Sequence, residues 1–227
     1  MSNLVPIALA LILVLLALPL LIRVLKLLFV RVVVRRVLKD VGDKAIAKQP
    51  DEIHLVAAPS YQWSNPEASD KLAQPLKTRG FIEAGIYTIT EMPGVGVRFL
   101  LNQATNSYAC VYEHGKAGNW VEVISRYQSG LGATYSQQPD RGMVRRSEDL
   151  VVNAPGADPG ELYERMLAER PKEPLISLSE GNIPRLFEKV FADQIRWKKE
   201  RGAKPEEVAR VVKSLKEHPI GKGADGE

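Results

Sequence analysis

The stretch that decides the fold is residues 81–137, FIEAGIYTITEMPGVGVRFLLNQATNSYACVYEHGKAGNWVEVISRYQSGLGATYSQ. Side chains alternate between two faces along runs of five to nine residues, as they do in β-strands. Turns rich in Gly, Asn and Pro separate the runs. The pattern predicts strands at residues 81–89, 95–101, 108–112, 120–127 and 131–137. Because these strands follow one another through short turns, we expect a five-stranded antiparallel meander.

Helical signals lie on both sides of this segment. Asn65 and Pro66 form a typical helix start before it, and Asp158 and Pro159 form another after it. Apolar residues from 183 onward recur at helical spacing up to a stop at Gly202, and a last helix begins at Pro205. The predicted class is therefore α+β, with C-terminal helices after the sheet.

The N-terminus has a different character. Residues 4–22 carry no charged side chain, and a helix of that length is about 28 Å long. This length approaches the roughly 30 Å of a bilayer's hydrocarbon, so we expect a single transmembrane helix. A cleavable signal peptide is a weaker reading because no basic residue precedes the run and its end is a poor cleavage site. A buried core helix would be shorter and would carry a polar face.

A basic segment follows this run. It has no acidic residue among its cations, which are Arg23, Lys26, Arg31, Arg35, Arg36 and Lys39. Basic flanks remain on the cytoplasmic side, so we expect a plasma (inner) membrane protein whose C-terminal domain is cytoplasmic. The single cysteine, Cys110, fits a reducing compartment. For the stretch 24–38 two readings stay open: a helix leaving the bilayer with snorkelling side chains, or a patch that binds anionic lipid headgroups.

These patterns divide the chain into four parts. They are an anchor with its basic segment (1–39), a polar linker (40–52), a cytoplasmic α+β domain (53–216) and a disordered tail (217–227). The first 39 residues hold six of the 31 Lys and Arg and none of the 27 Asp and Glu. The remainder therefore has a formal net charge of −2, which argues against nucleic acid as a partner.

No catalytic, cofactor-binding or metal-binding motif is recognised in the sequence. Cys110 and His114 would lie about 13 Å apart on one strand, which is too far for a hydrogen bond. The three histidines lie at no ligand spacing to one another or to the cysteine. Gly94-Val95-Gly96 lacks the third glycine and the following helix of a dinucleotide fingerprint. We therefore expect no cofactor and lean against an enzyme.

One set of strand residues is a candidate ligand groove. Aromatic and charged side chains come together on the last predicted strands, namely Trp120, Glu122, Arg126, Tyr127 and Tyr135. Aromatic strand residues more often belong to a hydrophobic core, and that alternative stays open. Gln194 is a further polar residue near the apolar stripe of the long helix, where it would mark a helix contact or a pocket.

Three functions remain compatible with the sequence. The first is a membrane-anchored interaction or binding module that uses lipid headgroups and a membrane or cytosolic protein as partners. The second is a membrane-bound enzyme resembling a hydrolase, which would need a deep pocket near Glu122, Arg126, Tyr135 and Arg145. The third is an accessory subunit of a membrane assembly, which would require a packing face on the first helix.

Overall fold

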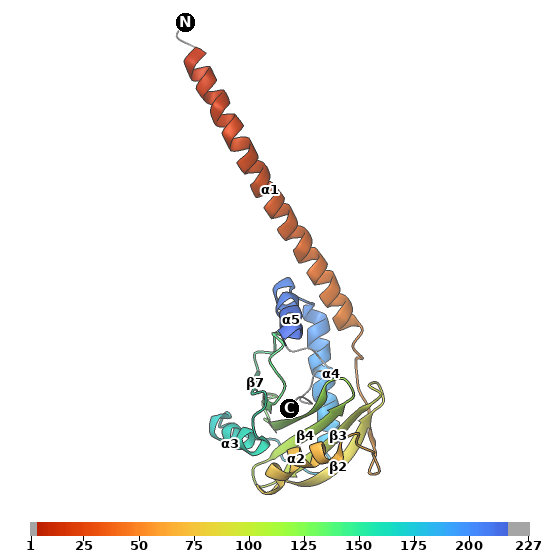
Figure 1. The fold of residues 1–227 in the computed structure, drawn as a ribbon. Coiled ribbons are helices and arrows are strands. Elements are labelled where there is room, and N and C mark those ends of the chain that lie inside the picture. Colours follow the sequence, from red (N-terminus) through yellow and green to blue (C-terminus); the bar gives the residue numbers. More distant parts are fainter. Residues whose placement is uncertain (1–3, 218–227) are drawn as a thin grey trace.

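The structure is a computed structural model that describes residues 4–217, with side chains described at residue 18 and from residue 23 onward. Seven strands form one sheet, in the order of the chain. They are β1 (Leu55–Ala57), β2 (Ile82–Ile89), β3 (Val95–Asn102), β4 (Ser107–His114), β5 (Gly118–Arg126), β6 (Gly132–Ser136) and β7 (Asp149–Asn153). The helices are α1 (Leu4–Ala47), α2 (Pro66–Lys77), α3 (Pro159–Glu169), α4 (Ile183–Arg201) and α5 (Pro205–Glu217). Figure 1 shows α1 as a long rod that leaves the α+β domain beside α5.

The sheet is mixed and larger than the pattern predicts. Strands β2 to β6 occupy the five predicted positions and pair antiparallel. β1 adds an antiparallel strand at one edge, and β7 adds a parallel strand next to β6 at the other. The prediction of a five-stranded antiparallel meander is therefore wrong. Because β7 runs parallel to β6, the chain must return from the end of β6 to the edge of the sheet where β6 begins. Residues 137–148 make this connection without a helix.

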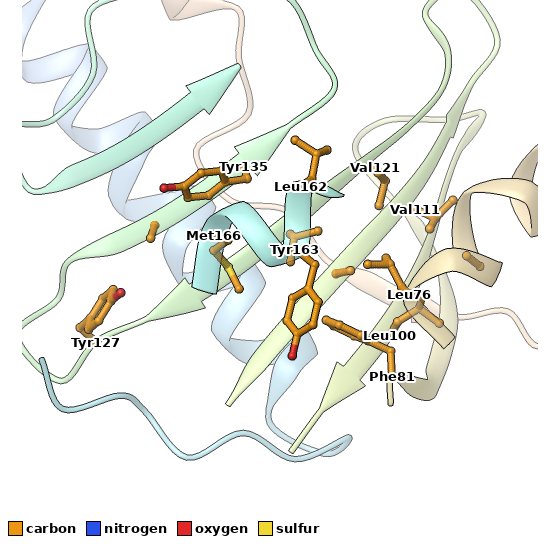
Figure 2. Close-up of a cluster of buried hydrophobic side chains, with 14 residues drawn as sticks. Leu76, Phe81, Leu100, Val111, Val121, Tyr127, Tyr135, Leu162, Tyr163 and Met166 are labelled. Carbon is orange, nitrogen blue, oxygen red and sulfur yellow. The ribbon is translucent and has the colours of Figure 1, made fainter. Parts of the chain in front are cut away.

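Helices cover both faces of the sheet (Figure 1). α2 and α3 pack on one face, where Leu76 and Met166 are buried among apolar side chains of β3 to β6 (Figure 2). α4 lies against the other face, where Phe187 packs edge-on against Phe99 of β3 at 5.4 Å between ring centroids. The two caps expected from the sequence are present: Asn65 accepts from Ala68 N, and Asp158 accepts from Gly160 N.

The predicted transmembrane helix is not supported. Of the residues that the structure describes, none belongs to a helix with the length and apolar character needed to cross a bilayer. The prediction of a single-pass transmembrane protein is corrected accordingly. The backbone of residues 4–22 is the first part of α1, and the helix does not end at the basic segment but continues to Ala47.

The end of α1 packs against the domain. Residues 40–47, which the pattern places in a polar linker, are helical and contact α5. Asp43 accepts a hydrogen bond from Ala203 N at 2.8 Å, and a Cβ on Gly42 would lie 2.5 Å from Ala203 Cβ. This contact fixes where α1 joins the domain. The predicted tail lies, apart from residue 217, outside the described residues.

Candidate functional site: a polar cavity beneath helix α4

A cavity of about 450 Å³ lies between α4 and the last strands of the sheet. Strand alternation creates one wall, because every second residue of β4, β5 and β6 faces α4. Register pairs Tyr112 with Trp120, Cys110 with Glu122 and Ile124 with Thr134, so these side chains share one face of the sheet. The helix wall repeats every three to four residues and comprises Phe187, Val190, Phe191, Gln194, Trp197 and Lys198. Most residues of the connection 138–146 between β6 and β7 also line the cavity, and Asp149, Val151 and Asn153 of β7 complete the lining.

Glu122 occupies the sheet wall as a half-buried carboxyl group. Its Oε1 accepts from Ser136 Oγ at 3.0 Å, and its Oε2 accepts from Tyr112 Oη at 3.2 Å. Burial raises the pKa of Glu122 above its ordinary value, and this effect outweighs the two hydrogen bonds and the positive charges of Arg126 and Arg145. The cavity therefore contains a carboxyl group that holds its proton more readily than one in water.

Arg126 lies deeper and is 8 % exposed. Its Nη1 is 3.7 Å from Asp149 Oδ1, which is a long ion pair. Its guanidinium lies beside the Tyr108 hydroxyl, but neither that hydroxyl nor Arg126 Nε makes a hydrogen bond of proper geometry within the described part of the chain. Gly132 makes room for this arrangement, since a Cβ at that position would lie 1.8 Å from Arg126 Nη1.

Four more cations line the cavity, and Arg145 and Lys198 are two of them. Arg145 Nη2 donates to Asn153 Oδ1 at 2.6 Å, whereas its buried Nη1 finds no partner among the described residues. Lys198 comes from α4, and burial lowers the pKa of its ammonium group. Buried polar groups in proteins are normally hydrogen-bonded, so the unpaired polar atoms of Tyr108, Arg126 and Arg145 beside one cavity make it the candidate functional site.

The structure divides the predicted groove. Glu122 and Arg126 line the cavity. Tyr127 and Tyr135 lie on the opposite face, in the core beneath α3 (Figure 2), and Tyr135 donates to Glu169 there at 3.1 Å. Their place in the groove is corrected for a simple reason: Tyr127 is an odd number of residues from Glu122, and Tyr135 pairs with Val123 rather than Glu122. Trp120 has the right face but stacks on Tyr112 at 4.7 Å and does not line the cavity.

Sequence reasoning missed several cavity residues. Tyr108 has the same parity as Tyr112 on β4, which was a usable signal. Lys198 continues the spacing of the α4 stripe from Gln194 and Phe191. Asp149 could not be found in this way, because it depends on the unexpected parallel strand β7. Arg145 belongs to the pocket expected for the enzyme alternative, and it does line the cavity. Gln194 does line the cavity.

The cysteine and the potential metal ligands add no further candidate site in the part of the chain that the structure describes. Cys110 is fully buried, and burial holds the pKa of its thiol well above the ordinary value. Over the described residues, no group of three or more His, Cys, Asp or Glu side chains is placed to hold a metal ion.

Comparisons of the chain with protein-family models, curated proteins and solved structures find no match.

The predicted lipid-contacting cations lie along α1. Arg35 and Lys39 form ion pairs with Glu206 (2.6 Å) and Asp43 (2.5 Å). The others are exposed on the same helix among large apolar side chains, of which Leu27 and Phe29 are each 70 % exposed. This part of α1 is thus apolar and basic at the surface, with no acidic residue between positions 23 and 39.

Proposed function

We propose that the α+β domain is a small-molecule binding module whose ligand occupies the cavity beneath α4. The observation that carries this proposal is a cavity of about 450 Å³ lined by polar and charged side chains, among them Glu122, Arg126 and Arg145, with unpaired polar atoms beside it. This volume lies within the range of roughly 300–1,000 Å³ typical of ligand pockets. A structural core would place apolar side chains here, because leaving buried polar groups unpaired costs about 1–3 kcal/mol each.

A cavity-filling variant tests the proposal. Thr134 lines the cavity from β6, so Thr134→Phe should occupy ligand space without removing a charged group. Ile82→Phe is the matched control, because Ile82 is 50 % exposed on β2 and lies away from the cavity. A chemically diverse set of small molecules is screened by thermal shift against the full-length protein and both variants.

We expect at least one class of compound to raise the melting temperature of the wild type and of Ile82→Phe, but not of Thr134→Phe. Stabilisation follows because a ligand that binds the folded state alone adds its binding free energy to the stability. A shift that survives in Thr134→Phe would place the ligand elsewhere and contradict the proposal.

An acid–base enzyme is the second candidate, and the raised pKa of Glu122 favours it. Perturbed carboxyl groups in clefts are frequent at catalytic sites. Glu122→Gln separates the two candidates, since the amide keeps the shape of the side chain but cannot transfer a proton. A binding module keeps its ligand affinity within a few fold in this variant, whereas an enzyme loses turnover of its substrate.

An anionic lipid surface is the partner that we propose for α1. Charge complementarity supports it: Arg23, Lys26, Arg31 and Arg36 lie on a helix whose large apolar side chains are exposed. Each cation near such a surface contributes about 1 kcal/mol, so four of them give up to roughly a thousandfold in affinity. This proposal concerns contact with headgroups and not a spanning helix. The predicted location at the plasma membrane, with a cytoplasmic domain, stays a prediction.

Vesicle binding tests the lipid contact. Replacing the four cations by Gln should abolish the preference of the full-length protein for phosphatidylglycerol-containing vesicles over pure phosphatidylcholine vesicles. The matched control replaces four exposed domain lysines, Lys71, Lys116, Lys172 and Lys189, by Gln. Equal loss in both variants would show that net charge matters rather than α1.

A further inference from the structure

The polar groups of the cavity favour one class of ligand. This inference rests on the proposed function, that the cavity binds a small molecule. We infer that the ligand is an organic anion, a carboxylate or phosphate ester, with an apolar ring-bearing body. Its anionic group faces Arg126, Arg145 and Tyr108, and its apolar body lies along α4.

Hydrogen bonding supports an acceptor on the ligand. The three unpaired polar atoms are Tyr108 Oη, Arg126 Nε and Arg145 Nη1. All three atoms are closed off from water, so a rearrangement of their side chains must accompany any hydrogen bond from them to a ligand. The two arginine atoms are donors without accepting capacity, and the hydroxyl can donate as well. Carboxylate and phosphate oxygens accept bonds from arginine, and these charge-assisted bonds are the strong ones.

Charge supports the same conclusion. Cationic lining residues outnumber acidic ones by five to three: Arg126, Arg141, Arg145, Arg146 and Lys198 against Glu122, Asp140 and Asp149. The acids already have partners within the protein. Asp149 lies by Arg126, Asp140 accepts from Gly142 N at 2.8 Å, and Glu122 accepts from two hydroxyls. A cationic ligand would therefore find an excess of like charge and no unpartnered carboxylate.

The remaining wall accounts for the apolar body. Phe187, Val190, Phe191 and Trp197 of α4 face Tyr112 and Ile124 of the sheet. An inorganic anion would leave this aromatic wall uncovered, although rings on both sides are well suited to hold a flat apolar group. In such pockets the apolar part of a ligand usually contributes most of the binding energy, and its polar group fixes its orientation.

A matched series of probes tests the inference by isothermal titration calorimetry on the full-length protein. The probes are naphthalene-2-carboxylate, its neutral amide, 2-naphthylmethylammonium and inorganic phosphate. We expect the carboxylate to bind at least tenfold more tightly than the amide, and the ammonium compound and phosphate to bind more weakly still.

Variants locate the anionic group. Tyr108→Phe keeps the ring and removes an unpaired hydroxyl, and it should weaken carboxylate binding three- to tenfold. Tyr127→Phe is the matched control, because it removes another unpaired buried hydroxyl from the opposite face of the sheet, and it should leave binding unchanged. Arg126→Gln should weaken binding at least tenfold. If that variant does not fold, Gly132→Ala displaces the guanidinium and keeps its charge, with the same expected direction.

The outcomes separate the inference from the proposed function. Amide or ammonium binding as tight as the carboxylate, with sensitivity to Thr134→Phe, would overturn the anionic ligand and leave the binding module intact. Equal effects of Tyr108→Phe and Tyr127→Phe would also overturn the inference. If no probe binds, the inference fails, and the diverse screen with Thr134→Phe alone decides whether the cavity binds anything.

Discussion

Glu122 shows what burial does to a single carboxyl group in this domain. In the unfolded chain it titrates near its ordinary value of 4.5, whereas burial raises the pKa in the folded protein. Between these two pKa values the folded state holds the proton that the unfolded state has lost. Folding stability therefore falls as the pH rises through this window, and the penalty is complete above the folded pKa.

Glu122→Gln should remove this pH dependence, because the amide does not titrate. We expect the variant to gain stability relative to the wild type as the pH rises above about 4.5, and to show no such gain at lower pH. Urea denaturation from pH 3.5 to 8 measures the difference in free energy of unfolding. The exposed Glu180→Gln serves as the control. A difference that stays constant across the range would contradict the raised pKa.

Residue chemistry was partly readable from the sequence. Glu122 and Arg126 could be predicted because they share the parity of Trp120 on one strand, which places charge beside an aromatic side chain. Tyr127 and Tyr135 lie on the other face, as the two-residue period of the strands requires: Tyr127 is five residues from Glu122, and Tyr135 pairs with Val123. The unpaired donors could not be predicted, since hydrogen-bond satisfaction depends on the tertiary arrangement around each atom.

At the scale of elements, long periodic segments were predictable and short ones were not. β2 to β6 alternate clearly, and α4 has a continuous apolar stripe. β1 is three residues long, and β7 follows an irregular connection, so neither leaves a periodic signal. Residues 40–47 carry many charges and look like a linker, but α1 persists there because its end packs closely on α5.

Gly42 permits this close packing between α1 and α5. A Cβ there would lie 2.5 Å from both Ala203 Cβ and Val208 Cγ2, so Gly42→Ala must push the two helices apart. Overpacking costs about 1–3 kcal/mol, against a gain of about 1 kcal/mol in helix propensity. We expect net destabilisation, with faster hydrogen exchange in α5. Val37→Ala, at an exposed site on α1, should change stability by no more than about 0.5 kcal/mol. Unchanged exchange in Gly42→Ala would show that the helices do not pack in this way.

Across the whole molecule, α5 connects α1 to the wall of the cavity. Arg35 and Asp43 of α1 contact Glu206 of α5 and Ala203 just before it. Glu207, 2 % exposed, accepts from Val144 N at 2.8 Å in the connection that lines the cavity. It also pairs with Arg201 at the end of α4 at 2.8 Å. One buried carboxylate therefore holds together the last turn of α4, the start of α5 and the cavity connection.

Glu207→Gln tests this arrangement. Breaking a buried ion pair on one side leaves the other charge uncompensated and costs about 3–5 kcal/mol. Arg201 would be that charge: its Nη2 donates to Glu207, and its Nε and Nη1 have no hydrogen-bond partner in the described part of the chain. Glu206→Gln changes the neighbouring residue, whose pair with Arg35 is more than half exposed on both sides and contributes about 0–1 kcal/mol. We expect urea denaturation to separate the two variants by several kcal/mol, and hydrogen exchange to rise in residues 138–146 of Glu207→Gln alone. Equal behaviour of the two variants would mean that α5 does not hold the cavity wall in place. A contact made by α1 would then not affect the ligand site through α5.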